Sequence, residues 1–129
     1  MRFCILVQSS PSTAGAFSAL QFTTAALKKG HEVIRVFFSG DAVSVANASN
    51  TYPQDERDLG KEWSQLAQQH QLDLVVCVSA ALKRGVLDEG EAQRYEKNAA
   101  TILPGFTISG MGQLIEAATI ADRIVTFGG

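Results

Sequence analysis

The sequence predicts an α/β fold with three layers: a mostly parallel five-stranded sheet with helices on both faces. Short apolar segments rich in β-branched and aromatic residues alternate with longer segments that have helical spacing. The chain has 129 residues, enough for one domain (1–129) with a buried core. No linker, repeat or low-complexity segment divides it. We therefore expect one sheet that uses the whole chain.

Five segments are expected to form the strands. Most of them are continuous apolar runs, which is typical of parallel strands covered on both faces. They are "FCILV" (3–7), "EVIRVFF" (32–38), "LDLVVCV" (72–78), the weaker "FTIS" (106–109), and "RIVTF" (123–127).

Four segments between the strands have helical patterns. The first, 14–29, stops at Gly30, a typical residue after a helix end. The second, 55–70, carries one apolar stripe, and the third runs from Asp88 to about 98 after a capping-box pattern. The fourth, 109–121, places Met111, Leu114, Ile115 and Ala118 on one side.

Composition limits the classes of function. Eleven basic against thirteen acidic side chains give a net charge of −2. Direct binding of nucleic acid needs a basic face, so this balance argues against it. The first apolar run is too short for a signal peptide or a membrane span, and we expect a cytoplasmic protein. The spacing of Cys4 and Cys77 fits neither a disulfide framework nor a zinc site, so two reduced thiols are expected.

A functional site is expected beyond the carboxyl ends of the strands, where parallel sheets hold their ligands. Three segments follow strand ends there: 8–15, 38–47 and 77–85. In a flavodoxin-like order, the first and third strands are neighbours. We therefore expect Cys77 to lie beside the loop 8–15.

The two histidines are not expected to help this cysteine. His31 and His70 both precede predicted strands, so a parallel sheet places them at the opposite pole. A six-residue strand separates the two poles by about 20 Å. Both histidines are expected to be surface or turn residues, and Cys77 has no histidine base.

Cys77 lies where an apolar strand meets a segment of small residues. Its position alone fits both a buried structural cysteine and a reactive thiol. Ser79 can cap a helix starting at Ala80, and N–H groups at a helix start lower the pKa of a thiol. Lys83 and Arg84 follow within two turns and add positive potential. Such a thiolate suits attack on sulfur, which it can hold as a persulfide.

The other candidate side chains are expected to be structural. Cys4 lies inside the first strand and is interpreted as a core residue. Trp63 is expected in the core, and Tyr52 is expected to pack in a loop. The loop "QSSPSTAG" (8–15) could instead hold a phosphate at a helix start, but it has one glycine and hydroxyl-rich loops are usually caps. The acidic residues look like solvent-facing helix starts: Asp55, Glu56, Asp58, Asp88, Glu89 and Glu91.

Three stretches carry a resemblance to a known family. They are "GHEVIRVFFSGDAVSVAN", "LDLVVCVSAALKRGVLDEGEA" and "GFTISGMGQLIEAATIADRIVTFGG". In this order, and over essentially the whole chain, the sequence resembles the DsrE/TusD family of sulfur-relay proteins. The most specific piece runs from Cys77 to Gly85: a cysteine, small residues, two basic residues and a glycine.

This resemblance implies a flavodoxin-like α/β fold without flavin and a sulfurtransferase that needs no metal or organic cofactor. The cysteine matching Cys77 would take sulfane sulfur from a TusA-like donor and pass it to a TusE-like acceptor. The sulfur would end in the 2-thiouridine of a tRNA wobble position. The implied partners are TusB-like and TusC-like subunits in a heterohexamer, without membrane or direct tRNA contact.

Three alternatives stay open at this point. The DsrE subunit of a DsrEFH complex has the same fold and chemistry but serves dissimilatory sulfur oxidation. A flavin or nucleotide module using the loop 8–15 belongs to a different class. So does a scaffold subunit in which Cys77 is inert. In any assembly, the long loop 44–56 could supply an interface.

Overall fold

The five strands form one parallel sheet. The computed structural model describes residues 1–129. Every pair of neighbouring strands is parallel, and the order is β4-β3-β2-β1-β5. The predicted five-stranded α/β fold is therefore confirmed. The strands are β1 (Arg2–Val7), β2 (Glu32–Phe38), β3 (Leu74–Cys77), β4 (Phe106–Ser109) and β5 (Arg123–Phe127).

The strand order differs from the flavodoxin-like order expected from the sequence. β1 lies between β2 and β5, and β3 lies between β2 and β4, so the first and third strands are not neighbours. The chain moves from β1 to β4 in one direction and then crosses back to the far side of β1. Apolar runs predict that strands form, but each run is compatible with several neighbours. The point at which the strand order reverses lies between β1 and β5, away from Cys77 at the end of β3.

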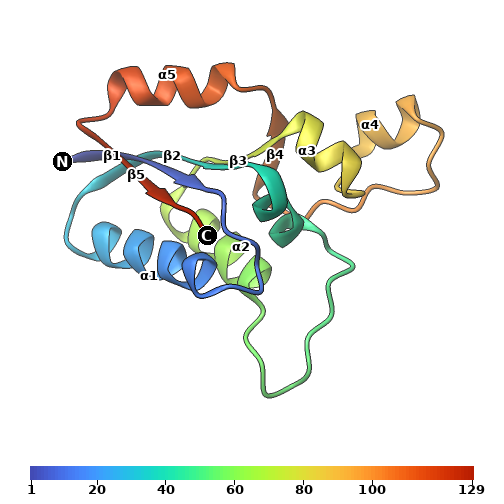
Figure 1. The fold of residues 1–129 in the computed structure, drawn as a ribbon, viewed down its shortest axis with the longest axis horizontal. Coiled ribbons are helices and arrows are strands. Elements are labelled where there is room, and N and C mark those ends of the chain that lie inside the picture. The colour runs from blue at the N-terminus through green and yellow to red at the C-terminus, as the bar shows by residue number, and fades with distance from the viewer.

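Helices cover both faces of the sheet and its carboxyl end (Figure 1). α1 (Ala14–Lys28) and α2 (Leu59–His70) lie on one face, and α5 (Gly112–Ile120) lies on the other. The 3-10 helix η1 (Gly40–Ala46) follows β2, and α3 (Val78–Lys83) and α4 (Glu89–Arg94) follow β3. No helix is long and apolar enough to cross a bilayer.

Three helices are more than one residue shorter than their sequence patterns suggest, and the first is α5, which was expected over 109–121 and spans Gly112–Ile120. α2 was expected from 55 but begins at Leu59, because the Asp58 carboxylate accepts a hydrogen bond from the Lys61 N–H at 3.1 Å and caps the helix. α4 was expected to about 98 but ends at Arg94, and Glu96 adopts a left-handed conformation with φ 57°. The side-chain caps and turns fix these ends more sharply than hydrophobic spacing does.

The largest core side chains pack between the sheet and α2. Trp63 is 1% exposed and meets the Phe38 ring edge-on, with 5.3 Å between ring centroids. Phe106 lies on the other side of Phe38 at 5.5 Å. Cys4 in β1 is completely buried. The predictions of a core tryptophan and a core Cys4 are confirmed.

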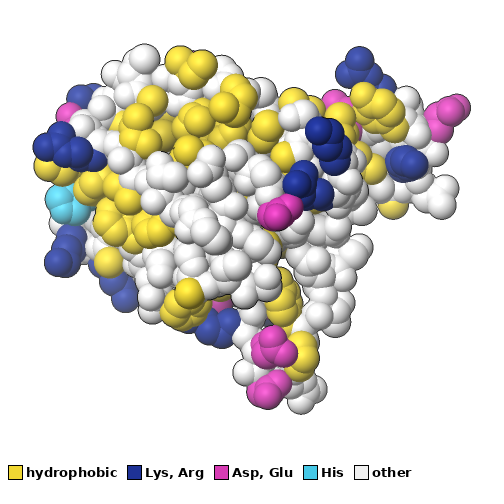
Figure 2. Space-filling model, in the orientation of Figure 1, with side chains coloured by type: hydrophobic (Ala, Val, Ile, Leu, Met, Phe, Trp, Pro, Cys, Tyr) yellow, Lys and Arg dark blue, Asp and Glu magenta, His cyan; other side chains and the backbone are white.

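α5 buries only part of the apolar side that its sequence predicts. Met111 and Ile115 are 51% and 62% exposed, whereas Ala117 is the helix's fully buried side chain. Arg35 of β2 fixes this orientation, because its guanidinium donates to the Gln113 carbonyl at 2.8 Å. Figure 2 shows the hydrophobic side chains gathered over α5. Met111 and Ile115 are therefore on the surface, whereas Leu114 on the same apolar side packs against the core.

Gly60 gives a test of the packing between α2 and η1. A methyl group at this position would meet the Val45 carbonyl oxygen and the Leu103 side chain. Alanine in a helix is favoured over glycine by about 1 kcal/mol, but overpacking costs about 1–3 kcal/mol and a backbone oxygen cannot move aside easily. We expect Gly60→Ala to lower the free energy of unfolding, measured by urea denaturation.

Gly90 is the matched control, because it is also the second residue of its helix. A methyl group there would only touch the Asp88 carboxylate at 3.6 Å. Gly90→Ala should be neutral or stabilising by up to about 1 kcal/mol. Equal effects of the two substitutions would contradict the packing described here.

Candidate active site

Cys77 is the last residue of β3 and at the same time the N-cap of α3. All four residues of β3 are buried, and Cys77 pairs with Ser109 of the edge strand β4. The strand passes into the helix without a loop, with Cys77 at φ −62° and ψ 125°. The thiol thus lies at the carboxyl end of the sheet, as predicted, and the Cys77 residue is 8% exposed.

Ser79 has a different role from the helix cap predicted for it. α3 begins at Val78, so Ser79 lies within the first turn rather than before it. Its hydroxyl oxygen is 3.6 Å from the Cys77 Sγ. When the thiol is ionised, only the Ser79 hydroxyl can donate in this pair. Ser79 therefore contacts the sulfur instead of capping the backbone.

The surroundings favour the ionised form of Cys77. Burial opposes ionisation, but the Ser79 hydroxyl, the N–H groups of Ala80 and Ser79, and the Lys83 charge together lower the pKa of the Cys77 thiol below its ordinary value. The N–H groups of the first helical turn have no partner inside the helix, so they are free to face the sulfur. Cys77 is therefore poised to act as a nucleophile.

The two basic residues after the cysteine behave differently. Of the groups that lower the pKa of Cys77, Lys83 contributes least, and it has no ion-pair partner. Arg84 instead pairs with Asp41 of η1 at 2.8 Å and donates to the Ala80 carbonyl at 3.1 Å. The sequence-based expectation that Arg84 supports the thiolate is therefore wrong. Its guanidinium ties α3 to η1.

Asp41 is a neighbour of α3 that the sequence did not reveal. It lies 43 positions before Arg84, and only the packing of η1 on α3 brings the two together. Ala80 and Ala81 are buried in the same region, at 8% and 0% exposure. The only sequence signal was the position of Asp41 after a predicted strand end. The neighbour of Cys77 is thus η1, not the loop 8–15 as expected.

The histidines lie at the opposite pole of the sheet, as predicted. His31 immediately precedes β2, and His70 ends α2 before β3. The His31 Nδ1 is 3.0 Å from the amino group of Met1, which is exposed. Neither imidazole is placed to take a proton from Cys77.

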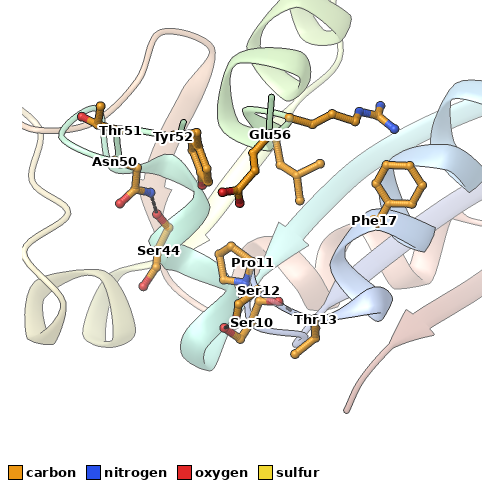
Figure 3. A pocket seen from close by; sticks show the side chains of 12 residues that line it. Ser10, Pro11, Ser12, Thr13, Phe17, Ser44, Asn50, Thr51, Tyr52 and Glu56 are labelled. Carbon is orange, nitrogen blue, oxygen red and sulfur yellow. Dashed lines mark hydrogen bonds between the residues drawn. The ribbon is translucent and has the colours of Figure 1, made fainter. Parts of the chain in front are cut away.

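The loop 8–15 borders a separate cavity of about 610 Å³ (Figure 3). Its lining includes the hydroxyls of Ser10, Ser12 and Thr13 and the ring of Tyr52. The single basic residue of the lining, Arg57, stacks over Phe17 and pairs with Glu62, which lies outside the lining. No cation of this cavity is free to meet a phosphate, which weakens the nucleotide alternative.

Two of the acidic residues have the role predicted for the group. Asp58 accepts from the Lys61 N–H at 3.1 Å, and Asp88 accepts from the Glu91 N–H at 2.8 Å. Both therefore cap helices. The Glu91 carboxylate makes no hydrogen bond in return and has one buried, unpaired oxygen, so the predicted capping box is half formed.

These features define an α/β protein with a parallel sheet that presents a cysteine thiol, Cys77, at a strand end. The chain matches the model of the DsrE/DsrF-like family over residues 1–127. It belongs to this family, which confirms the resemblance seen in the sequence.

Several relatives match over the full length. The chain is 51% identical to DsrE of Allochromatium vinosum, covering 99% of each chain. It is 46% identical to the sulfurtransferase TusD homolog of Pseudomonas aeruginosa, over 100% of this chain and 98% of the relative. The sulfurtransferase TusD of Salmonella enteritidis is also 46% identical, over 98% and 100%. The predicted class, a sulfurtransferase, is therefore confirmed.

The fold is also that of a solved structure. The YchN protein from E. coli superposes with a TM-score of 0.77, covering 98% of this chain and 100% of that one. The two sequences are 16% identical, so this comparison concerns the fold alone.

The pKa of Cys77 gives a prediction for Ser79. Removing the hydroxyl removes a hydrogen bond to the thiolate, so Ser79→Ala should raise the Cys77 pKa. The reactive thiolate is then scarcer at neutral pH, and alkylation by iodoacetamide at pH 7 should slow by about two- to tenfold. The rate is measured across pH by mass spectrometry of the Cys77 peptide.

Cys4 serves as the internal control in the same samples. It is fully buried, and burial raises its pKa, so it should stay unmodified while the protein is folded. An unchanged pH profile of Cys77 in Ser79→Ala would contradict the role given to the hydroxyl.

Proposed function

We propose that Cys77 carries sulfane sulfur as a persulfide and relays it between carrier proteins. The donor is a TusA-like protein and the acceptor a TusE-like protein, and the sulfur is destined for 2-thiolation of the tRNA wobble uridine in the cytoplasm. The observation that carries the proposal is the position of Cys77 at the junction of β3 and α3, where the Ser79 hydroxyl lies 3.6 Å from its sulfur. The lowered pKa of the Cys77 thiol is consistent with this position.

The chemistry needs only thiols and conserves atoms and electrons. The Cys77 thiolate attacks the outer sulfur of a donor persulfide, a new S–S bond forms on Cys77, and the donor S–S bond breaks. The donor leaves as a thiolate. In the second step, an acceptor thiolate attacks the outer sulfur of the Cys77 persulfide, and the Cys77 thiolate is regenerated. A low pKa helps in both steps, because Cys77 is first the attacking and then the leaving thiolate.

We further propose that the chain works in an assembly with TusB-like and TusC-like subunits. Hydrophobic side chains left exposed on α5 and on the edge strand β5 support this, with Met111, Ile115 and Ile124 each more than half exposed. Subunit association is the usual reason for such an exposed patch. The sequence-based suggestion of an interface in 44–56 remains a prediction.

A role as the DsrE subunit of a sulfur-oxidising complex is the second candidate. The observation that favours it is the identity of 51% to DsrE of Allochromatium vinosum, against 46% to the TusD relatives named above. The reaction at Cys77 is the same in both cases. The two roles differ in the proteins that exchange sulfur, which co-purification from the native organism distinguishes.

Persulfide loading tests the proposal directly. After incubation with a low-molecular-weight persulfide, mass spectrometry should find one added sulfur on the Cys77 peptide of the wild type. Cys77→Ser should take up none. Cys4→Ala is the matched control and should load like the wild type, because Cys4 lies in the core. Loading of Cys77→Ser at the wild-type level would refute Cys77 as the carrier.

A further inference from the structure

A cleft between α3 and α4 opens next to the thiol. It has a volume of about 560 Å³ and is lined by Ser79, Leu82, Lys83, Leu87, Tyr95 and Lys97. Ser79 connects the two places, because it lines the cleft and its hydroxyl is 3.6 Å from the Cys77 sulfur. A chain lying in this cleft therefore ends close to the reacting atom.

The lining combines apolar surface with unpaired positive charge. Tyr95 is 49% exposed, and Leu82 and Leu87 add aliphatic surface. Lys83 and Lys97 are exposed and make no ion pair, and no acidic residue lines the cleft. Figure 2 shows lysine and arginine side chains next to hydrophobic ones over α3 and α4.

We propose that the α3–α4 cleft docks an acidic, cysteine-bearing segment of the protein that exchanges sulfur with Cys77. This inference rests on the proposed function and names the docking surface of the same site. Two lysines without partners complement acidic side chains, and Tyr95 offers the kind of aromatic anchor that binds partner chains tightly.

The cleft favours a protein segment over RNA. An RNA-binding surface needs several cations that follow a phosphate backbone, and here two lysines flank apolar side chains in a chain with a net charge of −2. Arg84, the residue after α3, is occupied by Asp41. An extended acidic peptide uses both the charges and the apolar surface.

Two synthetic peptides provide the test, each with leucines and one cysteine that carries a persulfide. One peptide has glutamates around the cysteine, and the matched peptide has lysines at the same positions. The full-length wild type should take sulfur onto Cys77 about tenfold faster from the acidic peptide at low ionic strength. Lys97→Glu should abolish this preference, and Tyr95→Ala should slow uptake from the acidic peptide severalfold.

Two controls separate docking from chemistry. Lys61→Glu makes the same charge change on α2, outside the cleft, and should keep the preference. A low-molecular-weight persulfide without charged groups other than its S–SH should load the wild type, Lys97→Glu and Tyr95→Ala at equal rates, because it needs no docking surface. Failure of this small persulfide to load Cys77 would overturn the proposed function itself.

Different outcomes would overturn docking in the cleft without affecting the proposed relay. Normal loading by the small persulfide combined with equal rates for the two peptides, or a preference that survives in Lys97→Glu, would overturn docking and leave the relay intact. Binding of tRNA to the wild type that is lost in Lys97→Glu would also overturn it, in favour of an RNA surface.

Discussion

The direct passage from β3 into α3 is the constraint on which the site depends. Because no loop separates the two elements, the last strand residue also has to cap the helix, and the sequence has Cys77 there. The first N–H groups of a helix lack partners within it, so those of Ser79 and Ala80 are available to the sulfur. Backbone geometry thereby supplies much of what a histidine base provides in other cysteine enzymes.

The rest of the fold holds this junction in place. β3 is buried between β2 and β4, and η1 packs against α3 at the end of β2. The small side chains of Ala80 and Ala81 allow η1 and α3 to pack closely. The ion pair between Arg84 and Asp41 links the two helices at the surface. The site does not lie at the switch in strand order, where α/β proteins usually bind ligands. A thiol that reacts with a partner protein needs an accessible rim more than a deep crevice.

The five strands were predictable from the sequence because apolar runs are a local signal. The strand-end position of Cys77 was predictable in the same way, but position alone fitted both a structural and a reactive thiol, and the resemblance over Cys77 to Gly85 favoured the reactive one. Strand order was not predictable, because apolar runs carry no information about their neighbours. The buried face of α5 was not predictable from the apolar spacing of the helix. The helix packs through Ala117, and Arg35 of β2 anchors it through a hydrogen bond to a backbone carbonyl. Contacts between residues far apart in the sequence also separate the roles of Lys83 and Arg84. Lys83 lowers the pKa of Cys77, whereas Arg84 pairs with Asp41 of η1.

In the proposed relay, the thiolate form of Cys77 is the species that accepts sulfur. The most direct test measures the rate of sulfur uptake by Cys77 from a small persulfide as a function of pH, alongside the ultraviolet absorbance of the Cys77 thiolate. After correction for ionisation of the small persulfide itself, the two curves should rise together, with a midpoint below the ordinary pKa of cysteine. An uptake rate that follows the ordinary cysteine pKa, or that ignores the titration of Cys77, would contradict the account.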